Sequence, residues 1–289
     1  MITIKDNNLS PLPFYTDIDL QAHRRSYAYG QIYPLYTPSS FLLPFQIMRE
    51  HRASTPITLA KLYTKDGDYV MDLLSDMTIA GLKVVEFPDF SRDVIVFPAQ
   101  FSIASVIELG MYYLVLSDGT ETWYSDIMTI VNDMTPYLEV EWHDKSTLYC
   151  DAGIIVYDGI YKNRLFFNSE LGKPDYAFEE EGESRDGYFF AEKQISEKTY
   201  KFQFLAPEFV VDVMRLIRLS DVTRIRDKYN REFICDTFLI TPTWQTQGDL
   251  ASVVAEFQTA TVVKKIAKGY AFGNGGDYND DYNDDYNNQ

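Results

Sequence analysis

A hairpin pattern near the middle of the chain is the feature that most limits the fold. In GMYYLVLSDGTETWYSDIMTIV, residues 110–131, two runs of alternating side chains flank the turn sequence Ser-Asp-Gly-Thr at 117–120. Because successive side chains of a strand point to opposite faces of a sheet, this alternation predicts two antiparallel strands. A helix would instead repeat its apolar residues three and four positions apart. We therefore expect a mainly β fold.

Short strand-like runs of this kind continue through the first half of the chain. Asp66-Gly67-Asp68 separates two of them and is typical of a hairpin turn, and AGLKVVEF and DVIVFPAQFSI follow. The 22 Tyr and 19 Phe also suit pleated, half-buried surfaces. We expect residues 42–133 to form an antiparallel β-sandwich of immunoglobulin or fibronectin type.

A second β-rich domain is expected at residues 134–270, after a boundary at Asn132 to Pro136. It should be a β-sandwich carrying one amphipathic helix at about 207–219, because Pro207 and Glu208 suit a first helical turn. Lys228-Tyr229-Asn230 predicts a further hairpin. The acidic run at 179–183 is interpreted as a solvated loop.

Both ends of the chain differ from this pattern. Residues 1–41 contain several prolines and a row of tyrosines, and are predicted to be an extended arm that packs on something. Residues 271–289 are predicted to be an acidic, low-complexity tail. We expect both ends to contact other chains; the candidate assembly contacts are Phe14, Tyr15, Tyr27, Tyr29, Tyr33, Tyr36, Tyr278, Tyr282 and Tyr286.

The charge of the chain limits its partners. A formal net charge of −17 argues against nucleic acid and anionic membranes, because those partners are bound through Lys and Arg. No stretch approaches the ~20 apolar residues of a membrane span, and the first residues lack a signal-peptide pattern. We expect a chain made in the cytoplasm, with no nucleic acid partner and no membrane span.

Catalytic and cofactor motifs are missing from the sequence. His23, His51 and His143 lack the spacing of a zinc site, and there is no nucleophile elbow, phosphate-binding loop or dinucleotide fingerprint. The acidic tail fails the EF-hand pattern, with Tyr282 and Asn288 at its sixth and twelfth positions. We predict a protein that is not an enzyme, with no catalytic, cofactor or metal-binding residues.

Two pairs of residues leave alternatives open. Glu139 and Glu141 would share a strand face near Trp142, which could suggest a sugar site; the ordinary alternative is a solvent-facing polar row. Cys150 and Cys235 could pair only if the fold brought them together, and two buried free thiols are the favoured interpretation.

One long segment runs from IYKNRLFFNSELGKPDYAFEEEGESRDGYFF through CDTFLITPTWQTQGDLASVVAEFQTATVVKKIAKGY, within roughly residues 135 to 270. This segment, and more loosely LPFQIMREHRAS and YYLVLSDGTETWYSDI, resembles structural proteins encoded in tail modules of phages and prophages of gut Bacteroidetes. The resemblance implies a non-enzymatic structural component of a virion tail (tail tip, baseplate or connector ring) assembled in the host cytoplasm. Such proteins commonly form homo-oligomeric rings or tubes, with other virion tail proteins as partners.

An alternative of another class is a carbohydrate-binding or host-attachment module with a host surface glycan as partner. Trp123, Tyr124 and Trp142 are the aromatic candidates for such a site; the ordinary alternative is that they fill the cores. A hydrolase using Glu139 and Glu141 is the third alternative.

Overall fold

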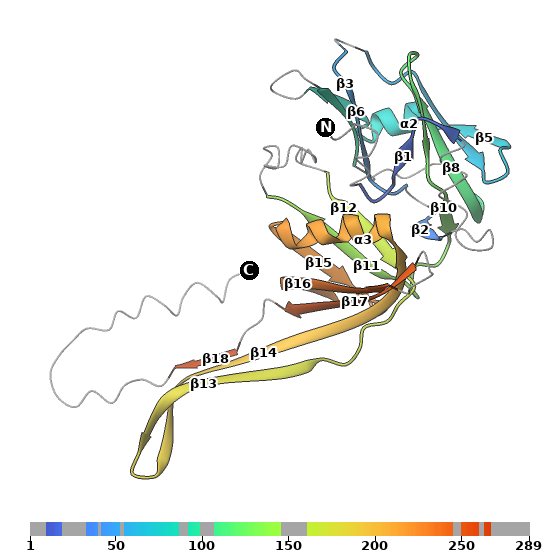
Figure 1. Cartoon of the computed structure of the whole chain (residues 1–289). Helices are drawn as coiled ribbons and strands as arrows, with labels where there is room; N and C mark the ends of the chain where they lie inside the picture. Colours follow the sequence, from blue (N-terminus) through green and yellow to red (C-terminus); the bar gives the residue numbers. More distant parts are fainter. Residues whose placement is uncertain are drawn as a thin grey trace. The chain divides into compact units, whose positions relative to one another are not determined.

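The fold was analysed in a computed structural model. The structure describes residues 10–18, 33–39, 42–52, 55–86, 92–98, 107–145, 161–244, 250–259 and 263–266. It divides into two compact units (Figure 1): residues 1–175 with 198–260, and residues 176–197 with 261–289. Strand β14 runs through both. The predicted boundary at residues 133 and 134 thus lies inside the first unit, between its sheets.

The mainly β fold expected from the alternation is confirmed. The first sheet has seven strands in the order β1-β9-β8-β10-β2, with β4 paired to β8 and β5 paired to β4. The bounds are β1 Phe14–Tyr15, β2 Leu35–Pro38, β4 Leu59–Thr64, β5 Tyr69–Asp72, β8 Gly110–Ser117, β9 Thr122–Ser125 and β10 Met128–Val131. Both predicted hairpin turns are present here, with Gly67 and Gly119 at positive φ.

Two strands of this sheet come from residues 1–41, which we predicted to be an extended arm that packs on something. Strand β1 pairs antiparallel with β9, and β2 pairs parallel with β10 up to Pro38. Leu12 and Leu35 are buried in the core. Both strands lie at the ends of the sheet order, where one side of each strand has no ladder hydrogen bond that a proline could remove. A proline-rich segment can therefore still be a strand, provided that it is an edge strand.

A three-stranded sheet packs on the first one. It consists of β3 (Phe45–Glu50), β7 (Arg92–Phe97) and β6 (Lys83–Glu86), all antiparallel. The ring of Phe45 lies 4.6 Å from that of Phe14 and 5.2 Å from that of Phe97, so one apolar core lies between the sheets. Helix α2 (Leu74–Ile79) precedes β6 and was not predicted, because six residues are too few to show a helical period.

The third sheet has the order β12-β11-β15-β16-β17-β14-β13, with β18 paired to β14. The strands are β11 Leu138–His143, β12 Asn163–Phe167, β13 Asp175–Arg185, β14 Tyr188–Pro207, β15 Val222–Arg226, β16 Glu232–Trp244, β17 Leu250–Thr259 and β18 Val263–Ile266. The hairpin predicted at 228–230 joins β15 to β16. The described residues of this half form one sheet, so the expected second layer of a sandwich is not among them.

The predicted helix covers one face of the third sheet. Helix α3 (Glu208–Arg215) continues as a 3-10 helix at Leu216–Leu219, and its buried side chains include Val213 and Met214. The facing strand β17 alternates, with Val253, Ala255 and Phe257 buried. The helix forms here because its apolar side chains fall on one side and meet this alternating face.

The acidic run at 179–183 is part of strand β13, and the expectation of a loop is wrong. Strands β13 and β14 are joined by Asp186 (φ 52°) and Gly187 (φ 83°). Two consecutive positive φ values define the turn of a two-residue hairpin, for which Asp-Gly is a preferred sequence. The turn chemistry therefore outweighed the low strand propensity of the glutamates.

The packing of the 3-10 helix predicts a contrast between two of its residues. Ile217 is 1% exposed and Leu219 is 78% exposed. Ile217→Ala should lower the free energy of unfolding by about 2–5 kcal/mol, because it leaves a cavity. Leu219→Ala should change it by less than about 0.5 kcal/mol. Urea denaturation of both variants measures this, and equal losses would contradict the described packing.

Candidate functional site

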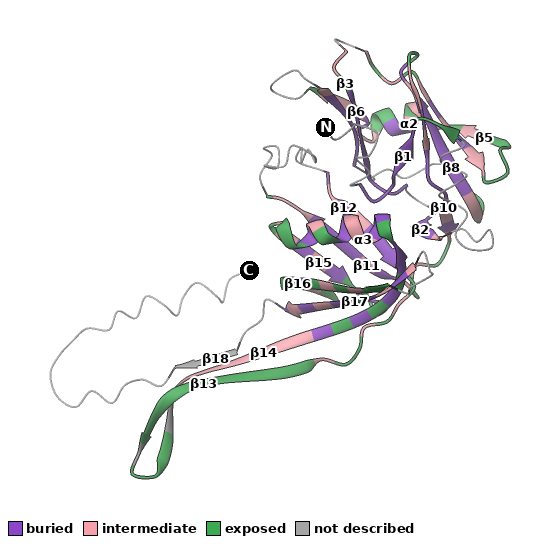
Figure 2. Ribbon diagram, viewed as in Figure 1, coloured by how far each residue is buried: buried purple, intermediate pink, exposed green. Residues whose placement is uncertain are grey.

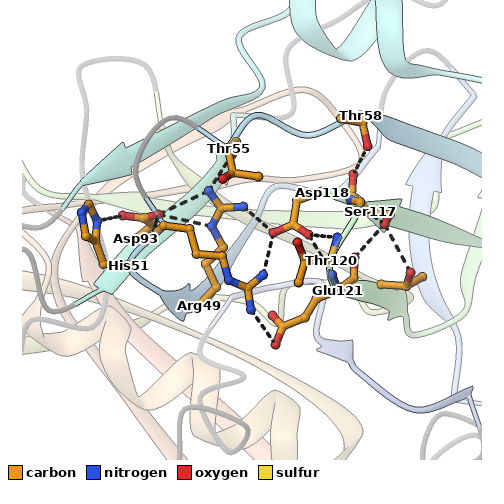
Figure 3. Close-up of polar contacts among 12 residues, drawn as sticks. Arg49, His51, Thr55, Thr58, Asp93, Ser117, Asp118, Thr120 and Glu121 are labelled. Carbon is orange, nitrogen blue, oxygen red and sulfur yellow. Dashed lines mark hydrogen bonds and ion pairs between the residues drawn. The ribbon is translucent and has the colours of Figure 1, made fainter.

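A buried charge network joins the two sheets of the first half (Figure 3). Arg49 of β3 is 1% exposed, and its guanidinium donates to Oδ2 of Asp93 on β7 at 3.3 Å and to Oδ2 of Asp118 at 2.7 Å. A third bond, at 2.6 Å, goes to the carbonyl oxygen of Thr55. Arg49 thereby connects strands β3 and β7 to the turn between β8 and β9.

A second arginine extends the network toward solvent. Arg52 contacts Oδ2 of Asp118 at 3.0 Å and Oε1 of Glu121 at 3.1 Å. The other oxygen of Asp118 accepts the backbone N–H groups of Thr120 and Glu121, both at 2.8 Å. The turn after β8 is therefore held by its own backbone and by two cations.

The two buried aspartates stay ionised in the folded protein. Burial acts to raise the pKa of Asp93, but hydrogen bonds from His51 and the Arg52 backbone and the charge of Arg49 outweigh it, so the pKa is lowered. The pKa of Asp118 is lowered against the same effect of burial by its backbone hydrogen bonds and both arginines. The network therefore depends on carboxylate charge.

A hollow of about 410 Å³ lies beside this network. Near it, His51, Glu86 and Asp93 place one ligand atom each within 4.8 Å of one another. Imidazole and carboxylate are zinc ligands. However, His51 Nδ1 is already 2.7 Å from Asp93 Oδ1, and Arg49 contacts the same carboxylate. A cation would meet a fixed positive charge there, so the arrangement suits a structural ion pair better than a metal.

The carboxylate pair on β11 is bound by basic side chains. Glu139 accepts from Arg164 and Arg226, each at 2.9 Å, and Glu141 is paired with Arg164 and, at 3.0 Å, with Lys162. The alternate residues of the strand, Leu138, Val140 and Trp142, are buried as expected, but the polar row does not face solvent: Glu141 is buried as well, because Arg164 and Lys162 cover it. The polar row is charge-paired across neighbouring strands.

The protonation of Glu141 bears on the hydrolase alternative. Burial acts to raise the pKa of this carboxyl, but the hydrogen bonds and charges of Arg164 and Lys162 outweigh it, and the pKa is lowered. The acid of a glycoside hydrolase needs a raised pKa so that it can donate a proton. The environment of Glu141 thus favours the carboxylate.

The aromatic candidates for sugar binding lie mostly inside the fold. Trp123 and Trp142 are buried core residues, and Tyr124 is half-buried. The expectation that such aromatics fill the cores is confirmed for both tryptophans. Of the thiols, Cys235 is free and half-buried, and burial raises its pKa to about 12; Cys150 lies outside the described residues.

Several candidate assembly contacts pack within their own chain. Phe14 and Tyr15 are buried on β1. The Tyr33 hydroxyl donates to the carbonyl oxygen of Leu205 at 3.0 Å, and its ring meets that of Phe209 edge-on at 6.3 Å. Burial, and secondly Tyr36, raise the pKa of Tyr33 above its usual range.

The ring of Tyr36 also packs against an aromatic ring of this chain. Its ring lies 4.5 Å from the ring of Tyr137, just before β11. The four described candidates therefore contribute to the fold of this chain. The other five, Tyr27, Tyr29, Tyr278, Tyr282 and Tyr286, lie outside the described residues.

The second unit carries the exposed surface that sequence reasoning missed. Residues 175–184 of β13 are all exposed, and Figure 2 shows this strand in green. Four described aromatic side chains of β13 and of the start of β14 are between 52% and 72% exposed: Tyr176, Phe178, Tyr188 and Phe189. The signal was present as a Tyr-x-Phe alternation before the glutamates and an Asp-Gly turn after them.

No protein family, curated protein or solved structure matches this chain. The described residues contain no helix with the length and apolar character needed to cross a membrane. The assignment of function therefore rests on the residues and the geometry described above.

Replacing Arg49 should lower the free energy of unfolding. Arg49→Met leaves two buried aspartates without their main cation, so we expect a loss of about 3–5 kcal/mol in the free energy of unfolding. Lys65→Met, which removes a lysine paired with Asp66 at the surface, should cost less than about 0.5 kcal/mol. Urea denaturation compares them, and a similar small loss in both would show that the network is not stabilising.

The lowered pKa of Asp118 predicts a pH dependence. A carboxyl with a lower pKa in the folded state stabilises fully above its unfolded pKa of about 3.9. This stabilisation is lost as the pH falls toward the folded pKa. Asp118→Asn should therefore be less stable than wild type at neutral pH, with a difference that narrows in acid. Urea denaturation from about pH 7 to about pH 3 tests this; a constant difference would contradict it.

Proposed function

We propose that this chain is a non-enzymatic structural component of a phage virion tail, at the tail tip, baseplate or connector ring, that acts through protein–protein assembly. The observation that carries the proposal is the exposed hairpin of β13 and β14, with four large aromatic side chains in solvent. The resemblance of residues 135 to 270 to tail-module proteins supports the same role.

The hairpin is poorly suited to a free monomer. Apolar surface gains free energy when it leaves water, and contiguous exposed apolar surface marks interaction sites. Among the described strands β13 has only β14 as a neighbour, and an uncovered edge strand invites pairing. A protein neighbour would cover both the aromatic rings and the edge. The formal net charge of −17 would keep the free subunit soluble before assembly.

The assembly we propose is a homo-oligomeric ring that also contacts other virion tail proteins. Its location would be the virion, after assembly in the host cytoplasm. In such a ring each subunit presents two different surfaces, and the contact closes by rotation. We further propose that the two packed sheets of the first half form an immunoglobulin-like sandwich, and that the helix-covered sheet is a separate module. A sugar-binding role finds no support in the buried tryptophans.

Light scattering over a concentration series tests the proposal. The wild-type chain should have the mass of a closed oligomer, and Y176S/F178S should be monomeric because it removes aromatic contact area from the hairpin. The control I79S/Y229S alters two equally exposed side chains of the first unit and should keep the wild-type mass. A wild-type chain that stays monomeric and also fails to bind neighbouring tail proteins would disprove the proposal.

A further inference from the structure

The second unit contains a three-stranded sheet with two outer edges. Lys193 and Gln194 of β14 contact Glu181 and Glu180 of β13, so β13 lies along one edge of β14 in this region. Strand β18 pairs antiparallel with residues 193–196 of the same strand. Because a strand has only two edges, β18 lies on the opposite edge. Among the described strands, β13 and β18 each have β14 as their single neighbour.

The two outer strands carry opposite charge. Strand β13 contains five acidic residues and one arginine, and β18 has the sequence Val-Lys-Lys-Ile at 263–266. Opposite charges on directly paired residues stabilise a sheet, and like charges destabilise it. Pairing β13 with another β13 would oppose glutamates to glutamates. Pairing β18 with another β18 would oppose lysines to lysines. Only the mixed pair matches acid with base.

We propose that strand β13 of one subunit pairs edge to edge with strand β18 of a second copy of this chain. Backbone hydrogen bonds would supply the affinity, and the charges would select this pairing over the two like-charged ones. Because the two edges differ, the contact is heterologous and leaves one edge of each kind for the next copy. The inference rests on the proposed ring and names the strands that close it.

A charge-reversal experiment distinguishes selective pairing from a general protective role of edge charges. E179K/E180K places two positive charges at the centre of β13 and removes its net negative charge, and K264E/K265E makes β18 acidic. Each variant alone would oppose like charges wherever residues 179–180 of one copy meet residues 264–265 of the next. We expect the concentration for half-assembly to rise at least about tenfold in each, since two charge pairs are inverted per contact. Light scattering measures the assembly, and circular dichroism confirms that each variant is folded.

Mixing the two charge-reversal variants gives a more specific test of the β13 to β18 pairing. In a 1:1 mixture of the two variants, the E179K/E180K strand β13 of one meets the K264E/K265E strand β18 of the other, and the remaining contact is wild type. The mixture should therefore reassemble with the two variants alternating, and it should recover the wild-type mass where the ring has an even number of subunits. The variant that combines all four substitutions should also assemble alone. D66K/D68K makes the same charge change on the exposed turn between β4 and β5 and should leave assembly unchanged.

The outcomes separate this inference from the proposed function. Folded single-strand variants that assemble like wild type, or a mixture that stays dissociated, would overturn the β13 to β18 pairing while the wild-type ring still stood. A wild-type chain that is monomeric at all concentrations would overturn self-pairing as well. Only the further absence of binding to other tail proteins would reject the structural role.

Discussion

The buried ion pairs of Arg49 determine how the first half of the chain can be arranged. An unpaired charge inside a protein costs several kcal/mol, so the guanidinium must have its carboxylates, and the carboxylates must have it. Asp93 comes from a neighbouring strand and Asp118 from a turn of the other sheet. The apolar core between the sheets would tolerate small shifts of one sheet over the other, but these charge-assisted hydrogen bonds require one arrangement.

The second unit has the opposite physical character. Strand β13 is exposed along its described length and has no core of its own. Its stability depends on backbone pairing with β14 and on whatever covers its edge. The first half of the chain is thus held by buried ion pairs and an apolar core, whereas the hairpin leaves aromatic side chains exposed to solvent.

The same residue types have different roles in the two units. In the first, carboxylates lie next to arginines, as in the row formed by Glu139, Glu141 and Arg164 across β11 and β12. In the second, glutamates outnumber cations along strand β13, and Glu180 and Glu181 make exposed contacts with Gln194 and Lys193, which contribute little to stability. Carboxylates that are paired with arginines in the same chain stabilise its fold. Carboxylates in excess along a strand favour pairing with a strand of opposite charge.

Local chemistry in the sequence determined the β class, the turns at residues 66–68, 117–120 and 228–230, and the helix near 207–219, because alternation, turn residues and helical period act over a few neighbours. The alternation of Glu139 and Glu141 with apolar residues was also predicted correctly, but the burial of Glu141 under basic side chains of β12 and its flank was not. Only the tertiary structure decided that the proline-rich segment adds β1 and β2 to a sheet, that Arg49 meets Asp93 and Asp118, and that the lysine-containing strand β18 pairs with β14. These pairings join residues tens of positions apart, so the pattern of near neighbours could not specify them.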